Sequence, residues 1–203
     1  MERIYELNQT IYDKQADAFI GDPLFSLFTT DIKARKKAII SICQLALYNS
    51  KGETFIYTAD DSYNALAIWE RVGVKKLRNP FKVLYCHYKM ITCGCIKEIS
   101  TYGKRLSEIQ KRIDLNKRRS DYYLNLLYVA PECQGKGLAS ELMKPMLSYM
   151  DENQLVCSTD TNNEKNVGMY EHYGFTVVEK VQRIEGITTY ILRREPLECT
   201  SEN

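Results

Sequence analysis

A glycine-rich hexapeptide at residues 134–139, QGKGLA, has the composition of an anion-binding turn. It follows an apolar run over residues 124–129 and a proline at position 131, and it precedes apolar residues at helical spacing. A strand, a tight turn and a helix start in this order direct free backbone N–H groups and the positive end of a helix dipole at one point. The sequence therefore predicts a phosphate-binding site here.

Two common phosphate-binding motifs do not match this turn. A P-loop requires Gly-Lys-Ser/Thr after a four-residue spacer, which is missing. A dinucleotide fingerprint requires a third glycine at a fixed offset, which is also missing. A tight turn without any ligand would explain the glycines equally well, so a second signal is needed.

That second signal is the segment NVGMYEHYGF at residues 166–175. It resembles the Asn-x-x-x-Tyr-x-x-x-Gly-Phe signature of the GNAT superfamily of N-acetyltransferases. Residues 126–139 resemble the acyl-CoA motif of the same superfamily, a strand followed by Val-x-Pro and Gln/Arg-x-x-Gly-x-Gly/Ala. Both signatures occur in the expected order and cover about residues 122–180, which makes the pair far more specific than either one.

The N-terminal half carries weaker likenesses. Ala18-Phe19 with Asp22-Pro23, followed by Asp31 and Arg35, resembles the puromycin-acetyltransferase-like branch of the superfamily. A strand that ends at Trp69 is also usual in that branch.

The resemblance implies acetyl-CoA as the acetyl donor, with no metal. In the family the pantetheine arm pairs with the central strand, and a strand N–H near Leu127 would face the thioester oxygen as an oxyanion donor. The turn would grip the diphosphate with backbone N–H groups. The residues implied to hold the donor are Leu127, Tyr128, Val129, Gln134, Gly135, Lys136, Gly137, Leu138, Ala139, Ser140 and Asn166.

The resemblance also implies catalytic residues. Tyr170 matches the family's general acid, although a buried aromatic side chain packed on the sheet is the simpler alternative. Asp160, at the end of a strand where the branch often has Glu, is the first candidate for the general base, ahead of Glu132 and His172. Trp69 and Tyr57, with Tyr85, are expected to line the acceptor pocket, but core packing explains these aromatics as well.

Bulk properties set further limits. The 203 residues suffice for one substantial core, and a formal net charge of +2 argues against a general nucleic-acid binder. Apolar runs are too short to span a bilayer, and the N-terminus lacks the apolar core of a signal peptide, so a cytoplasmic location without membrane contact is expected. Seven scattered cysteines suggest reduced thiols, and Cys93-Gly94-Cys95 lacks the partners of a zinc site.

The pattern of apolar residues predicts helices, a hairpin, helices, and then strand, helix, strand, helix and hairpin. We expect helices at 10–18, 31–49, 83–91, 106–113, 136–150 and 163–173, and strands at 54–59, 65–69, 122–129, 155–159, 175–181 and 188–192. The basic cluster at 111–119 is interpreted as a solvated helix end.

Together these observations predict a GNAT-like α/β fold, a mostly antiparallel sheet with one parallel, splayed strand pair flanked by helices. A single domain at 1–195 would combine an acceptor side (1–120) with an acetyl-CoA core (121–195), followed by a flexible tail (196–203). The expected activity is direct acetyl transfer to the primary amine of a small molecule by a monomer or homodimer. A protein or peptide N-acetyltransferase and a non-catalytic acyl-CoA-binding module are the alternatives.

Overall fold

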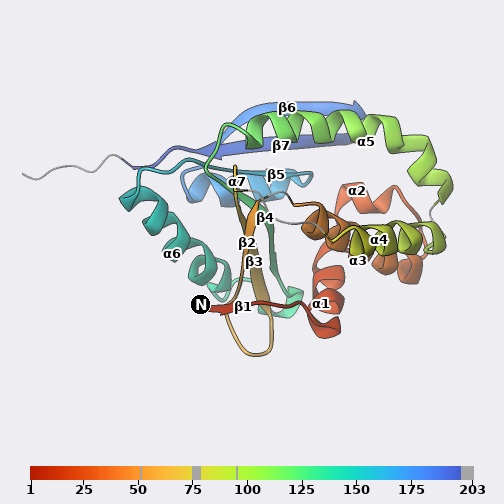
Figure 1. Cartoon of the computed structure of the whole chain (residues 1–203), viewed down its shortest axis with the longest axis horizontal. Helices are drawn as coiled ribbons and strands as arrows, with labels where there is room; N and C mark the ends of the chain where they lie inside the picture. The colour runs from red at the N-terminus through yellow and green to blue at the C-terminus, as the bar shows by residue number, and fades with distance from the viewer. Residues whose placement is uncertain (51, 75–78, 95, 198–203) are drawn as a thin grey trace, which may run out of the picture.

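The computed structural model describes residues 1–50, 52–74, 79–94 and 96–197. Within these residues, seven strands form one sheet in the order β1-β2-β3-β4-β5-β7-β6 (Figure 1). All neighbours are antiparallel except β4 and β5, which are parallel. The strands are β1 (Glu2–Ile4), β2 (Glu53–Thr58), β3 (Ala65–Arg71), β4 (Tyr122–Val129), β5 (Cys157–Thr161), β6 (Thr176–Ile184) and β7 (Ile187–Arg194).

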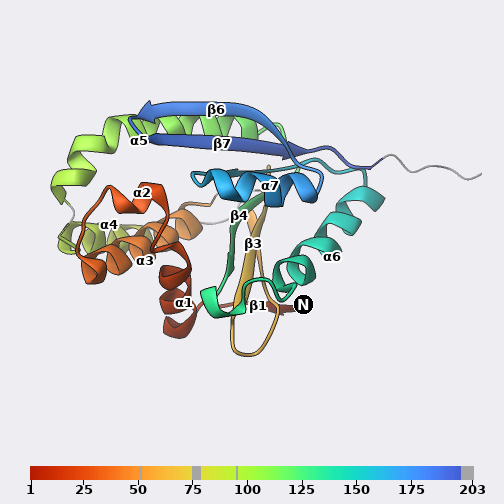
Figure 2. The ribbon, with the colours of Figure 1, turned by 180° about the vertical axis from the view of Figure 1, so that it is seen from behind.

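The helices lie on both faces of this sheet. Figures 1 and 2 show α6 on one side of β2–β4 and α1 and α3 on the other, while α5 runs along the β6–β7 hairpin. The mixed sheet with flanking helices confirms the predicted fold class. The helices are α1 (Gln9–Phe19), α2 (Pro23–Ser26), α3 (Ile32–Asn49), α4 (Pro80–Thr92), α5 (Ile96–Lys117), α6 (Leu138–Glu152) and α7 (Glu164–His172), with a 3₁₀ turn at Pro131–Cys133.

Several helices begin at a polar side chain, as the sequence suggests. The carboxylate of Asp31 accepts the Ala34 N–H at the start of α3, and the amide oxygen of Asn8 accepts the Ile11 N–H at the start of α1. Such a cap satisfies one of the unpaired N–H groups of the first turn and typically contributes about 1 kcal/mol. The predicted elements are all present, whereas the short β1 and α2 were not predicted.

Strand β4 contains a β-bulge at Asn125. On β3, Ile68 pairs with Leu126 and the next residue, Trp69, pairs with Leu124, so Asn125 has no partner in the ladder. The extra residue reverses the alternation of side chains between the two faces of the sheet. Before the bulge Leu124 packs in the core under α6, whereas beyond it Leu127 and Val129 take that face.

The parallel pair β4–β5 separates after a short contact. Its register runs from Tyr122 opposite Cys157 to Leu124 opposite Thr159 and then stops, although both strands continue. The Thr159 hydroxyl donates to the Leu124 carbonyl at 3.0 Å at the last paired position. The bulge and the separation therefore occur at the same level of the sheet.

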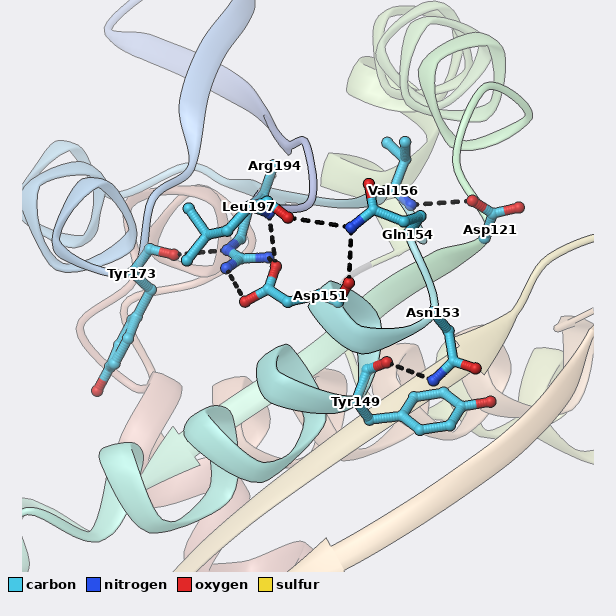
Figure 3. Close-up of polar contacts among 9 residues, drawn as sticks. All are labelled: Asp121, Tyr149, Asp151, Asn153, Gln154, Val156, Tyr173, Arg194 and Leu197. Carbon is cyan, nitrogen blue, oxygen red and sulfur yellow. Dashed lines mark hydrogen bonds and ion pairs between the residues drawn. The ribbon is translucent and has the colours of Figure 1, made fainter. Parts of the chain in front are cut away.

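A polar clamp ties the C-terminal ends of α6 and β7 together (Figure 3). The Arg194 guanidinium donates to both carboxylate oxygens of Asp151 at 2.7 Å and to the Tyr173 carbonyl at 2.9 Å. Asp151 also accepts the Leu197 N–H at 2.9 Å. Bidentate arginine–carboxylate pairs are among the strongest polar contacts in proteins. The clamp fixes the end of β7, the strand that neighbours β5.

Candidate functional site

The turn between β4 and α6 is built from unusual backbone conformations. Gly135 and Gly137 have φ values of 78° and 84°, the left-handed region that side chains disfavour. A Cβ atom added at either glycine would meet no atom within 4 Å, so both face open space. Gly137 is the N-cap of α6, and no described side chain caps that helix start. The first N–H groups of α6 are thus available to a ligand.

The neighbouring edge of β4 is also open. The Ala130 N–H donates to the Asn64 carbonyl at 2.6 Å, so the backbone of Ala130 faces the hairpin side. Strand alternation gives Tyr128 the same direction and directs the N–H and C=O groups of Leu127 and Val129 toward the opposite edge. At that edge the described pairing with β5 has already ended. An extended ligand could pair with Leu127 and Val129 there, whereas the backbone of Tyr128 serves the pairing with β3 and its hydroxyl donates to the Tyr63 carbonyl at 3.0 Å.

The remaining residues predicted to hold the donor lie around this opening. The Ser140 hydroxyl, in the first turn of α6, is 2.9 Å from the Tyr173 hydroxyl at the end of α7. The Asn166 amide donates to the Thr161 hydroxyl at 3.3 Å, and the Gln134 amide donates to the Val129 carbonyl at 3.5 Å. Lys136 is exposed. Helices α6 and α7 therefore flank one end of the gap between β4 and β5.

Tyr170 is buried where the two strands separate. Its hydroxyl is hydrogen-bonded to Thr159, the last residue of β5 that pairs with β4, and its ring packs edge-on against Phe175. Burial and the nearby Asp160 carboxylate raise the pKa of Tyr170 above its usual range, so the phenol keeps its proton at neutral pH. Tyr170 therefore fits both interpretations of the sequence. It is a buried core residue, and it also holds a proton next to the gap between β4 and β5.

A cavity of about 1030 Å³ opens on the other face of the sheet, between β3–β4 and helices α1, α3 and α5. Most of its wall is apolar, and its polar side chains gather at the sheet. Apolar contributions come from Phe19, Phe25, Ile42, Leu45, Leu47, Ile68, Ile113 and Leu126. Its polar side chains include Glu70, Asp114, Lys117, Tyr123, Asn125 and Asp160.

Glu70 is the most heavily hydrogen-bonded of these groups. Its carboxylate accepts from Lys117 Nζ at 2.7 Å, from the Asn125 amide at 3.1 Å and from the Gly52 N–H at 3.0 Å. Burial alone would raise its pKa, but donors including Lys117, Ser50 and Asn125 outweigh burial and lower the pKa below the ordinary value. Glu70 therefore stays ionised and fixes the bulge residue Asn125 in place.

Asp160 has a different environment. It accepts a hydrogen bond from the Tyr123 hydroxyl, and burial raises the pKa of this tyrosine so that the hydroxyl keeps its proton. Burial raises the pKa of Asp160, while Tyr123 and Lys117 oppose that rise. The cavity thus holds two carboxylates with pKa values displaced in opposite directions, an arrangement typical of acid–base sites.

The structure separates some predicted site residues from this cavity. Trp69 is fully buried in the core under α6, on the face of β3 opposite Ile68 and Glu70, and Tyr57 packs against the same core. Tyr85 lies exposed on α4. The aromatic acceptor wall expected from these residues is therefore not part of the cavity. Glu70, Tyr123 and Asn125 were not predicted as site residues from the sequence. The position of Glu70 directly after the apolar run 65–69 could have indicated it.

Cys157 is the first residue of β5, where that strand pairs with β4. Cys157 is fully buried, and burial raises its pKa to about 12, so it is a neutral thiol at physiological pH. Cys95 lies outside the described residues, which leaves the Cys93–Cys95 pair untested. Among the described residues no group of three or more metal-ligating side chains comes together. No described helix is both long and apolar enough to cross a membrane.

Comparison with known proteins agrees with this geometry. Residues 109–194 match the family model described as acetyltransferase (GNAT) domain. The matched segment resembles that domain, and it contains β4, the glycine turn, α6, β5, α7 and the terminal hairpin. The match does not include α1–α3, which contribute much of the cavity wall, or α4.

Individual relatives extend the comparison. An uncharacterised N-acetyltransferase of Schizosaccharomyces pombe is 22% identical over 89% of this chain and 76% of its own length. An uncharacterised N-acetyltransferase of Escherichia coli is 32% identical over 38% of this chain, which spans about half (51%) of that protein.

A crystal structure from Corynebacterium glutamicum, described as histone acetyltransferase HPA2 and related acetyltransferase, covers 98% of this chain and 99% of its own, with a TM-score of 0.54 and 14% identity. That likeness in fold includes the N-terminal half of the chain. The puromycin-acetyltransferase-like branch is not confirmed by these relatives.

Proposed function

We propose that this protein is an acetyl-CoA-dependent N-acetyltransferase that transfers an acetyl group to the primary amine of a small molecule. The observation that carries the proposal is the separation of β4 from β5 between two differently built sites. One side of the gap offers uncapped backbone N–H groups at 135–140, and the other side opens on a cavity with buried carboxylates.

The donor side fits an acyl-CoA. Gly135 and Gly137 leave open space at a helix start that suits a diphosphate, and the free edge of β4 at Leu127 and Val129 suits the amide groups of a pantetheine arm. Acetyl-CoA would supply an activated thioester at this place. Gln134 and Lys136 flank the turn, and Ser140 and Asn166 line its α6–α7 side.

The acceptor side fits an amine with an apolar body. The cavity volume, about 1030 Å³, is at the upper end of the usual range for small-molecule sites. Its apolar walls would hold the body, and the carboxylates at the sheet would attract an ammonium group. Glu70 is already neutralised by Lys117, so Asp160 is the carboxylate better placed to receive a proton.

Proton transfer requires one donor and one acceptor. Tyr170 retains its proton beside Thr159 and is the proposed general acid for the departing thiolate. Asp160 is the proposed general base, since a carboxylate with a raised pKa accepts a proton from an ammonium group more readily. The two residues lie on α7 and β5, at the level where the strands separate. The puromycin-acetyltransferase-like branch stays a prediction from the N-terminal motifs.

Release of free thiol from acetyl-CoA tests the proposal. The purified chain is assayed against small primary amines with alkyl or aryl bodies and, separately, against peptides with free N-termini or lysines. Turnover with small amines supports the proposal. Turnover with peptides alone would favour the protein N-acetyltransferase alternative. Calorimetric binding of acetyl-CoA without turnover on any amine would indicate a non-catalytic acyl-CoA-binding module, and no binding would reject the donor site itself.

A further inference from the structure

Helix α4 (Pro80–Thr92) exposes an unusual number of large apolar side chains. One face packs on α3 through Val83, Cys86 and Met90. Five residues of the opposite face have 55–79% of their surface exposed, and no other described helix shows such a group. These residues, hereafter the outer stripe, are Phe81, Leu84, Tyr85, Tyr88 and Ile91.

The outer stripe is continuous along the helix. At about 100° per residue, its five members fall within an arc of about 120°. The only other residue in this arc is Thr92, whose hydroxyl bonds back to the carbonyls of Tyr88 and Lys89. A soluble helix normally presents polar side chains outward, so an apolar outer arc indicates a surface that is covered by something else.

The charge around the outer stripe is of one sign. From residue 71 to residue 97 the sequence holds seven lysines and arginines and no aspartate or glutamate. Of these cations, Lys82 and Lys89 border the stripe, with their ammonium groups near the rings of Tyr48 and Tyr85. Three more, Lys75, Lys76 and Arg78, lie outside the described residues.

The apolar outer stripe and the cations around it together distinguish among the possible binding partners of α4. A second copy of this chain, related by a twofold axis, would bring Lys82 and Lys89 of one subunit toward the same cations of the other without any acid to pair with them. Nucleic acid would match the cations, but the branched side chains of Leu84 and Ile91 offer no stacking surface to bases. An anionic bilayer surface matches both features, since it accepts apolar and aromatic side chains and attracts lysines.

We propose that α4 is a membrane-docking helix, which inserts the outer stripe into the interfacial region of a bilayer rich in anionic phospholipid. The helix lies in the plane of the surface and does not span it. This inference replaces the expectation from composition that the protein has no contact with membranes. It is independent of the proposed acetyl transfer, because no residue of the outer stripe lines the cavity.

Co-sedimentation of the full chain with lipid vesicles tests this inference. We expect binding to phosphatidylcholine vesicles that contain about 30% phosphatidylserine, and much weaker binding to phosphatidylcholine alone. Added salt should weaken the binding. The triple variant Phe81→Ser, Leu84→Ser, Tyr88→Ser should lower the partition coefficient by more than about tenfold, since it removes most of the inserted surface.

Two further variants sharpen the test. The control Leu115→Ser, Val178→Ser alters exposed apolar residues on α5 and β6 and should bind like the parent. The variant Lys82→Glu, Lys89→Glu keeps the outer stripe and should bind phosphatidylserine vesicles more weakly. Circular dichroism confirms that each variant is folded.

The inference is overturned if the parent does not sediment with anionic vesicles, or if the triple variant binds as well as the parent. It is also overturned if sedimentation equilibrium finds a dimer that the triple variant dissociates, which would assign the outer stripe to a second copy. Retention on single-stranded nucleic acid that depends on the outer stripe would reject it in the same way.

Discussion

The proposed donor side and the proposed acceptor side of this molecule are built from different parts of the chain. The donor side uses backbone: two glycines at positive φ, an uncapped helix start and an open strand edge. The acceptor side uses side chains from β3, β4, β5, α3 and α5 that meet in one cavity. A site made of backbone depends on a short contiguous motif, whereas a site made of side chains depends on the packing of distant segments.

The strongest test of this contrast is Gly137→Val. A β-branched residue at φ 84° is strained and its side chain would project into the space at the start of α6. We expect acetyl-CoA binding to fall below detection in calorimetry. Gly103→Ala, on α5 with ordinary φ and open surroundings, is the matched control and should bind normally. Normal binding by the valine variant would mean that this turn does not hold the donor.

The next largest effect is expected at Tyr170, which lies between the proposed donor and acceptor sides. Tyr170→Phe removes the phenolic proton but keeps the ring packed against Phe175. Turnover should fall about hundredfold, the usual contribution of a general acid, while acetyl-CoA affinity stays unchanged. Tyr149→Phe, at the far end of α6, should leave both quantities unchanged. Equal turnover for the two variants would assign Tyr170 to packing alone.

On the acceptor side, Lys117→Met should reduce stability. Glu70 is almost fully buried and would lose its cation, so we expect the free energy of unfolding at neutral pH to drop by about 2 kcal/mol. Because the folded-state pKa of Glu70 is lowered, the stabilisation that Lys117 gives is present above the ordinary glutamate pKa and is lost as the pH falls below it.

Urea unfolding curves at neutral pH and at about pH 3.5 measure this dependence. The two proteins should differ most at neutral pH and converge in acid. Lys111→Met, an exposed lysine of the same helix, should behave like the parent at both pH values. A difference that is independent of pH would show that Lys117 acts through packing and not through the charge of Glu70.

The smallest effect is expected for Asp160→Asn. Turnover should fall about tenfold, because the amide cannot accept a proton from the substrate. The raised pKa of Asp160 means that its ionisation opposes folding, a cost that is absent below the ordinary aspartate pKa and complete above the folded-state pKa. The variant should therefore be more stable than the parent at neutral pH and equally stable in acid. Lower stability at neutral pH would contradict this account.

The contrast also explains what the sequence could predict. Residues 134–139 and 166–175 are short contiguous segments, so their local order was sufficient to predict a glycine turn at a helix start and a second helix beside it. The acceptor prediction chose Trp69 and Tyr57 for their aromatic rings. Those rings point into the core under α6, because Tyr57 pairs with Ala67 and therefore shares the face of Trp69.

The missed polar residues Glu70, Tyr123 and Asn125 lie on one face of β3 and β4. Because Tyr123 pairs with Glu70, regular alternation already predicts this face for Asn125, whereas the β-bulge that keeps Leu126 on the same face has no signature in the apolar pattern of residues 122–129. Glu70 itself could have been predicted from the sequence, because it is a charged residue at the end of a buried strand. Its lysine partner, 47 residues away on α5, could be found only in three dimensions.

The bulge at Asn125 makes β4 one residue longer than the stretch of β3 it pairs with, and that residue can be removed without disturbing the core. Deleting the Asn125 codon would leave Leu124 opposite Trp69 and Leu126 opposite Ile68, so Leu127 and Val129 would stay in the core under α6. The loss would fall on the cavity, where Glu70 would lose the amide that donates to it. A library of single-codon deletions should therefore retain folded protein at this position, whereas a deletion within a regular strand would turn its downstream side chains to the other face of the sheet.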